Sequence, residues 1–206
     1  MNPLLLAIRQ AMVFSGQLEN DVNRLLHVYH CPKTAEHSAR VGAEAEKLAA
    51  IFGGDKAAAR TAGWLHDISA IIPNSERIPS AEKLEIDILP EEAMFPMIIH
   101  QKISRAIAQD VFQIRDQTIL SAIECHTTLK SHPSQMDLIV FIADKIEWDQ
   151  PGKPPYLDEL LAELEYSLER GAFVYIEYLW NQRNQLKVVH PWLIDAYEYL
   201  KPKCMH

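Results

Sequence analysis

Histidine and aspartate side chains lie on the apolar faces of several expected helices in this sequence. His37 shares such a face with Val41 and Leu48, because residues at these spacings lie on one side of a helix. The same reasoning selects six residues: His37, His66, Asp67, His100, His126 and Asp144. Imidazole and carboxylate ligands together suit iron, manganese, zinc or cobalt better than magnesium or calcium. The pattern therefore predicts a metal site inside a helical core.

The prediction depends on the six residues jointly. A single inward-facing histidine is more often a hydrogen-bonded core residue than a metal ligand. Asp144 is harder to explain in that way, because it lies in the apolar run LIVFIADKIE. An ionised carboxylate there costs several kcal/mol of desolvation unless it is paired or bound to a metal.

The remaining histidines are not expected to be ligands. His27 and His30 have no acidic partner on their helical face, and His132 lies in a loop that could line the mouth of a site. His190 and His206 are expected at the surface or at the chain terminus. Cys125 adjoins His126 but points about 100° away on a helix, so it is expected in the core.

Helices account for almost the whole chain. Asn2 followed by Pro3 is typical of a helix start, and Gly53-Gly54 of a helix end. With few alternating apolar runs, no strand is expected, and the fold class is all-α. A proline-rich loop at 149–155 precedes a long helix. The expected helices cover residues 3–12, 19–30, 34–52, 55–69, 80–88, 95–112, 116–127, 134–148, 156–180 and 191–200.

The chain length of 206 residues suits one domain. We expect a single domain over 1–206, with a core at about 34–148. The N-terminal helices within 1–31 and the C-terminal helices within 156–200 would pack on that core. The amphipathic segment 156–180 could serve as core or as the face of a homodimer.

Composition excludes several classes of function. The formal net charge of −8 argues against a nucleic-acid-binding protein, which needs clustered lysine and arginine. No apolar run is long enough to span a membrane, and the N-terminus lacks the features of a signal peptide. The three cysteines, Cys31, Cys125 and Cys204, have no disulfide-type spacing, so a cytoplasmic location is expected.

The ordered ligand set resembles that of the HD superfamily of metal-dependent phosphohydrolases. The segments EHSARVGAEAEKLAAIFGGD, AGWLHD, AIECHTTLKS and LIVFIADKIE look most like those of the YqeK-type symmetrical diadenosine tetraphosphate hydrolases. The resemblance implies an HD-domain helical bundle with a dinuclear metal site in its core. It also implies a nucleotide substrate, diadenosine tetraphosphate, cleaved to two ADP by a metal-bridging hydroxide.

The resemblance implies a role for each ligand. His37, His66, Asp67 and Asp144 would hold one metal, and Asp67 would bridge to a second metal. His100 and His126 would complete the second site. Two divalent metals are implied, iron first among them, with manganese, cobalt and zinc as alternatives. His66, Asp67 and Arg40 would form the catalytic set.

Positive side chains are needed for the phosphates that the metals do not contact. Arg40 lies one turn after His37 and is the first candidate. The other candidates are Lys102, Arg105, Lys130 and Lys145. The family usually has a lysine where this chain has Ala70, and a tyrosine where it has Lys145. The metal ligands are therefore shared with the family, while the substrate contacts differ.

Other functions are compatible with the same ligand set. One is a phosphodiesterase or nucleotide phosphatase acting on another substrate. Another is a nucleotide sensor that binds without turnover, and a third is an oxygenase with dinuclear iron. Dioxygen consumption with a substrate that lacks phosphate would identify the oxygenase, and binding without hydrolysis would identify the sensor.

Overall fold

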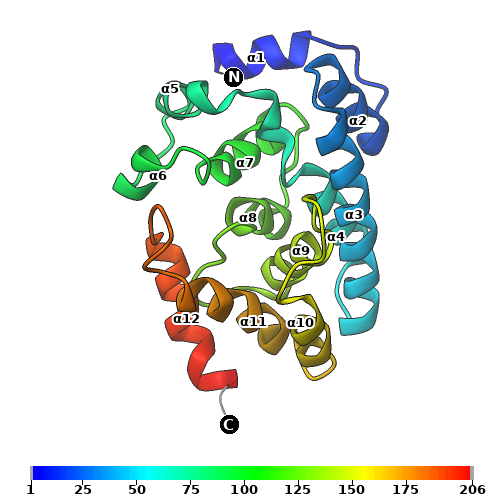
Figure 1. The fold of residues 1–206 in the computed structure, drawn as a ribbon. Helices are drawn as coiled ribbons and strands as arrows, with labels where there is room; N and C mark the ends of the chain where they lie inside the picture. Colours follow the sequence, from blue (N-terminus) through cyan, green and yellow to red (C-terminus); the bar gives the residue numbers. More distant parts are fainter. Residues whose placement is uncertain (1, 205–206) are drawn as a thin grey trace.

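The computed structural model describes residues 2–204 and contains helices but no strand in that part of the chain, which confirms the all-α prediction (Figure 1). The α-helices are α1 (Pro3–Gln10), α2 (Leu18–Val28), α3 (Pro32–Phe52), α4 (Lys56–Leu65), α5 (Arg77–Lys83), α6 (Pro90–Met94), α7 (His100–Asp110), α8 (Gln117–Cys125), α9 (Gln135–Ile146), α10 (Leu157–Leu164), α11 (Leu168–Asn181) and α12 (Pro191–Cys204). Two 3₁₀ turns, η1 (Ile68–Ile71) and η2 (Asn74–Glu76), connect α4 to α5. No helix in the described residues is both long and apolar enough to cross a membrane.

Local capping signals set several helix ends where the sequence predicts them. The side chain of Asn2 accepts a hydrogen bond from the backbone N–H of Leu4, and Asp55 accepts one from Ala58. Each bond satisfies a backbone donor that the first helical turn leaves free. Gly53 ends α3 with a φ of 78°, a left-handed conformation that glycine adopts without a steric penalty.

The single helix expected over 156–180 is instead a pair, α10 and α11. Ser167 has an extended backbone conformation, and its hydroxyl accepts a hydrogen bond from the N–H of Arg170 at the start of α11. At Gly171 a Cβ atom would lie 3.0 Å from the side chain of Leu164, so glycine permits the two helices to pack closely. The expectation of one long helix was wrong because an N-cap inside the segment begins a new helix.

Several other helix boundaries differ from the expected ones. The helix expected over 80–88 is α5, which runs from Arg77 to Lys83 and is followed by Glu85 with a left-handed φ of 57°. The helix expected over 191–200 continues to Cys204.

The helix expected over 95–112 begins only at His100, since a proline at position 96 disfavours helical geometry in the residue before it. The short helix α6 was not expected. The helix expected over 55–69 ends at Leu65 and continues as the 3₁₀ turn η1. These differences place His66 and His100 at helix ends.

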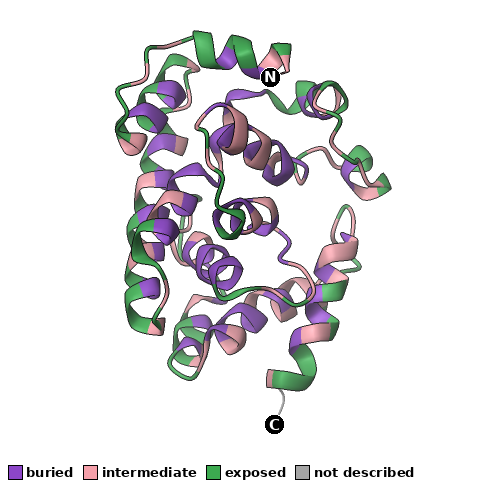
Figure 2. Cartoon of the chain, turned by 180° about the vertical axis from the view of Figure 1, so that it is seen from behind, coloured by how far each residue is buried: buried purple, intermediate pink, exposed green. Residues whose placement is uncertain are grey.

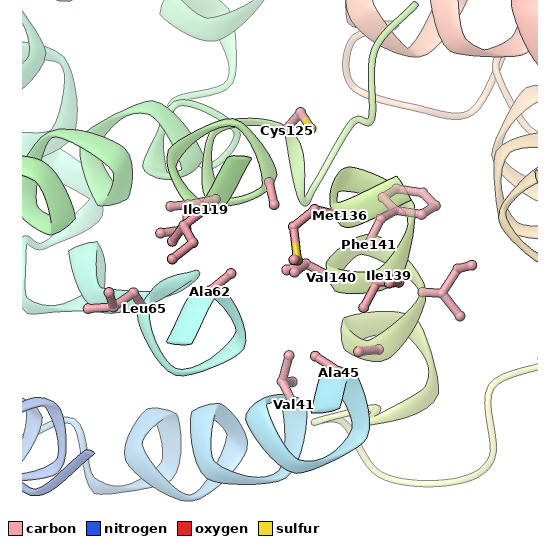
Figure 3. Packing of buried hydrophobic residues seen from close by; sticks show 14 of the residues in the cluster. Val41, Ala45, Ala62, Leu65, Ile119, Cys125, Met136, Ile139, Val140 and Phe141 are labelled. Carbon is pink, nitrogen blue, oxygen red and sulfur yellow. The ribbon is translucent and has the colours of Figure 1, made fainter. Parts of the chain in front are cut away.

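Helix α9 lies at the centre of the core and contacts α3, α4, α8 and α11. Figure 2 shows buried residues concentrated on the inner helices, with exposed residues on the outer ones. Figure 3 shows Val41 and Ala45 of α3, Ala62 of α4, and Ile139 and Val140 of α9 directed into one apolar interior. On the periphery, α2 packs on α3, and α12 packs on α11.

Helices α3 and α4 approach each other at two glycines. A Cβ atom on Gly63 would lie 2.7 Å from the Cα atom and 2.8 Å from the backbone nitrogen of Gly42. Both contacts are to backbone, which cannot move aside as a flexible side chain can. This approach fixes the distance between the helices that carry His37 and His66.

We expect Gly63→Ala to lower the free energy of unfolding by about 1–3 kcal/mol, the usual cost of an added group in a packed interior. Urea denaturation would measure the change. Ala57→Ser, at an exposed position of the same helix, should change stability by less than about 0.5 kcal/mol. Equal stability of Gly63→Ala and the unmodified protein would show that the two helices are not held at this distance.

Candidate metal centre

The six histidine and aspartate residues lie together, although they come from five different parts of the chain. His37 lies in the second turn of α3, and His100 is the first residue of α7. The other four lie at the ends of α4, α8 and α9, whose carboxyl ends carry partial negative charge that favours a cation nearby. Every one of the six belongs to at least one group of side chains that could hold a metal ion.

Three of the histidines are oriented by the same backbone hydrogen bond. The Nδ1–H of His66 donates to the carbonyl of Gly63 at 2.7 Å. His126 donates in the same way to Ile123, at 2.8 Å, and His100 to the residue three positions before it. Because a carbonyl can only accept, Nδ1 carries the proton of the neutral ring, and Nε2 presents a lone pair. This second hydrogen bond is characteristic of histidines that bind metals.

The free nitrogens face one another. The Nε2 atoms of His37 and His66 are 3.3 Å apart, and those of His100 and His126 are 2.9 Å apart. Two nitrogens bound to one metal at 2.0–2.1 Å lie about 2.8–3.4 Å apart. The side chains present are therefore suited in both chemistry and spacing to divalent metal ions.

Asp67 lies between the two histidine pairs. Its Oδ1 atom is 3.1 Å from Nε2 of His100 and 3.4 Å from Nε2 of His126. Its Oδ2 atom is 3.6 Å from Nε2 of His66. Each carboxylate oxygen thus faces a different pair, which is the arrangement needed to bridge two cations.

Asp144 completes the group around His37 and His66. Its Oδ1 atom is 3.1 Å from Nε2 of His37 and 3.6 Å from Nε2 of His66. Its Oδ2 atom accepts a hydrogen bond from the Lys145 ammonium at 2.5 Å. Lys145 also donates to the backbone carbonyl of His126, at 3.2 Å. The lysine therefore orients the carboxylate and leaves Oδ1 directed at the histidines.

The cluster favours positive charge at its centre. Burial opposes ionisation of Asp67 and Asp144, yet facing histidines, with Lys145 beside Asp144, lower the pKa of both carboxyls well below the usual value. Burial also opposes the charged form of His66, but the two carboxylates raise its pKa to about 9. Burial lowers the pKa of His126 to about 4. Without a metal, a proton on His66 supplies the positive charge.

Two cavities open onto the cluster. One, of about 180 Å³, is lined by five of the six cluster residues, all except His66, and by Lys145. The other, of about 320 Å³, borders His37 and Asp67 and carries two cationic side chains, Lys33 and Arg40. The first cavity is also lined by Thr127, Trp148, Asp149 and Tyr175.

Comparison with known proteins identifies the family. Residues 34–149, more than half of the chain, match the HD domain. The chain belongs to the HD domain family. The match covers the core predicted from the sequence, at about 34–148, and includes all six residues of the cluster.

Relatives place the chain among HD-domain hydrolases. It is 32% identical over 146 residues to a Staphylococcus aureus protein named symmetrical bis(5'-nucleosyl)-tetraphosphatase, covering 68% of this chain and 72% of that one. It is 48% identical over 141 residues to an uncharacterised Lactococcus lactis subsp. cremoris protein, covering 68% and 71%. A crystal structure of a predicted HD superfamily hydrolase involved in NAD metabolism, from Clostridium acetobutylicum, superposes with a TM-score of 0.81 at 26% identity over 89% and 97% of the two chains.

Two of the five cationic side chains predicted to bind substrate lie near the cluster of six histidine and aspartate residues. Lys145 lines the smaller cavity, and Arg40 lines the larger one, where it pairs with Glu147 at 3.1 Å. The structure does not bring the other three to the cluster. Arg105 faces Glu124 at 3.6 Å, and Lys130 pairs with Asp137 at 3.1 Å.

Lys102 lies in a separate buried network. Its ammonium is 2.8 Å from Glu92, and Glu92 is 3.3 Å from Nε2 of His190. Residues two positions apart on a helix face nearly opposite directions. Lys102 is two positions after His100, so it points away from the cavity that His100 faces. His190 is 2% exposed, and the expectation that it lies at the surface was wrong. His132 packs on Tyr199 instead of lining either cavity, and His206 lies outside the described residues.

Several residues near the cluster were not found from the sequence. Lys33 lies one turn before His37, and the helical spacing that selected Arg40 would also have selected it. Thr127 follows His126, and its hydroxyl is 3.2 Å from Nε2 of His100. Trp148 and Tyr175 carry no sequence signal, because only the packing of distant segments brings them to the cavity.

Glu92→Gln is expected to lower the free energy of unfolding by about 3–5 kcal/mol, since it leaves Lys102 charged, buried and without its partner. Burial raises the pKa of Glu92, but hydrogen bonds from His190 and Lys102 lower it overall below 4.5. The stability from ionised Glu92 is therefore present above about pH 4.5 and lost as the pH falls below it. Urea denaturation should show that the difference in free energy of unfolding between the unmodified protein and the variant becomes smaller as the pH falls from 7 to 3.

Glu91→Gln provides the control, because Glu91 forms no ion pair with any described residue. It should change stability by less than about 0.5 kcal/mol. A Glu92→Gln protein as stable as the control at pH 7 would show that the buried network does not stabilise the fold.

Proposed function

We propose that this HD-domain hydrolase cleaves a phosphoanhydride bond of a nucleotide, with diadenosine tetraphosphate as the leading substrate and two ADP as the products. The observation that carries the proposal is the position of Asp67. One of its oxygens faces His66 and the other faces the pair His100 and His126. A carboxylate placed in this way can hold two cations close together, as hydrolysis of phosphate anhydrides by paired metals requires.

The proposed ligands form two groups that share Asp67. His37, His66 and Asp144 would complete one group, and His100 and His126 would complete the other. We propose iron as the metal, because imidazole and carboxylate ligands suit it, with manganese, cobalt and zinc as alternatives. Bound there, two divalent metals would activate water and polarise the phosphoryl oxygen under attack.

Side chains of this chain would bind and orient the substrate. Lys33 and Arg40 in the larger cavity would hold phosphates, and Lys145 would keep Asp144 directed at the histidines. Attack of one water on a central phosphorus breaks its bond to the oxygen that joins the two central phosphates. Two ADP leave, and the proton released by the water passes to solvent. Three positive side chains and two metals also explain how an acidic protein could bind a polyanion.

The relatives support a nucleotide substrate. The Staphylococcus aureus protein carries the name of a symmetrical tetraphosphatase, and the Clostridium acetobutylicum structure is titled as a hydrolase involved in NAD metabolism. Both names refer to dinucleotides joined through phosphates.

Protein prepared without oxygen is expected to contain two metal ions per chain, chiefly iron, by elemental analysis. His126→Ala should reduce the content to about one ion, because the proposed assignment places His126 in the second group. Asp67→Asn should reduce the affinity of both sites by at least about tenfold. His27→Ala removes an exposed histidine outside the cluster and should retain two ions. Two ions retained by His126→Ala would contradict the assignment.

Asp67→Ala and His66→Ala should lower the rate of diadenosine tetraphosphate hydrolysis by at least about 100-fold. This exceeds the usual loss of activity when a residue that only supports a metal ligand is replaced. The measurement is turnover in the presence of added metal, with the products separated by chromatography. The unmodified protein should release two ADP per substrate.

Other products would identify other functions. AMP with ATP would overturn the symmetrical cleavage, and wild-type turnover by Asp67→Ala would overturn the site itself. Hydrolysis of a cyclic nucleotide or a nucleoside monophosphate, but not of the tetraphosphate, would indicate a different phosphohydrolase. Nucleotide binding without turnover would indicate a sensor, and dioxygen consumption would indicate an oxygenase.

A further inference from the structure

A third cavity, of about 160 Å³, adjoins the metal centre on the side of the C-terminal helices. It lies between the segment before α7 and the loop at 182–190 that joins α11 to α12 (Figure 1). Thr127 and Tyr175 line both this cavity and the 180 Å³ cavity at the cluster. The two cavities are therefore adjacent, with the side chains of Thr127 and Tyr175 at their shared border.

The walls of this cavity differ in chemistry from those of the metal centre. No carboxylate is found among the described residues that line it. The ring of Phe95 forms part of one wall, and the Lys187 ammonium lies 4.8 Å from its centroid. Most of the remaining surface is aliphatic, from Ile98, Leu179, Leu186, Val188 and Leu193.

His190 does not make the cavity polar. Its Nδ1 atom accepts a hydrogen bond from the backbone N–H of Trp192, so its Nε2–H donates to Glu92. Both ring nitrogens are thus occupied by protein partners. The hydroxyl of Thr128 likewise donates to the carbonyl of Leu129. The cavity presents flat and aliphatic surfaces and few free polar groups.

We infer that this apolar cavity holds the base of the nucleotide whose phosphates lie at the metal centre. This inference rests on the proposed function. The cavity has room for on the order of ten waters, so its volume is comparable to that of a bicyclic base. Aromatic rings bind bases through their faces. A ligand with a flat apolar end joined to a polyanion matches an apolar cavity that borders a metal site.

The inference predicts that the two ends of a symmetrical dinucleotide bind in different surroundings. The larger cavity beside His37 and Asp67 shares no lining residue with the apolar cavity, and its Lys33, Glu36 and Arg40 suit phosphates and sugar hydroxyls. One base would occupy the apolar cavity, and the other would lie towards solvent. Discrimination between bases would then come from one half of the substrate only.

The test compares the binding of ADP and inorganic pyrophosphate by calorimetry with Mn²⁺, because the two differ only in the nucleoside. The unmodified protein should bind ADP at least about tenfold more tightly, in keeping with the usual strength of base stacking on an aromatic ring. Leu186→Trp, in the loop, should fill the cavity and remove most of this preference, and Val188→Trp serves as a second variant. Leu161→Trp adds the same ring at an exposed position of α10 and should retain the preference.

The outcomes separate this inference from the proposed function. Equal affinity for ADP and pyrophosphate in the unmodified protein, or an unchanged preference in correctly folded Leu186→Trp and Val188→Trp, would overturn the base site. If ADP preference disappears in both variants but the unmodified protein hydrolyses no diadenosine tetraphosphate, the base site stands and the proposed reaction fails. If hydrolysis occurs and the preference persists in the variants, the reaction stands and the base lies elsewhere.

Discussion

Four imidazole nitrogens and two carboxylates facing one another inside an apolar core are the constraint on which the rest of the structure depends. Lone pairs only 2.9 and 3.3 Å apart repel unless positive charge lies between them. Between His37 and His66, a metal ion or, without one, a proton on His66 provides that charge. The core can therefore accept these polar groups because a cation compensates for their burial.

Helix ends make this convergence possible. A histidine that follows a helix can donate from Nδ1 to a carbonyl left free in the last turn, as His66 and His126 do. One hydrogen bond thereby completes the helix, fixes the tautomer and directs Nε2 into the site. The contact between Gly42 and Gly63 then holds α3 and α4 close enough for His37 to meet His66.

Charge is used differently on the two sides of α7. His100 begins the helix and faces the metal centre, while Lys102 joins Glu92 and His190 in a network that ties α6 and α7 to the segment before α12. That network forms one border of the apolar cavity, since His190 lines it. The lysine that could have bound phosphate instead stabilises the wall of the proposed base site.

The helical class, most capping positions and the six residues of the cluster could be predicted before the fold was known, because they follow from local spacing and from the cost of burying a charge such as Asp144. The sequence did not reveal the break at Ser167 or the burial of His190. It also could not show which cations face the site: Arg40 and Lys145 do, whereas Lys102, Arg105 and Lys130 have other partners. Those outcomes depend on contacts between residues far apart in the chain, and only the tertiary structure decides such contacts.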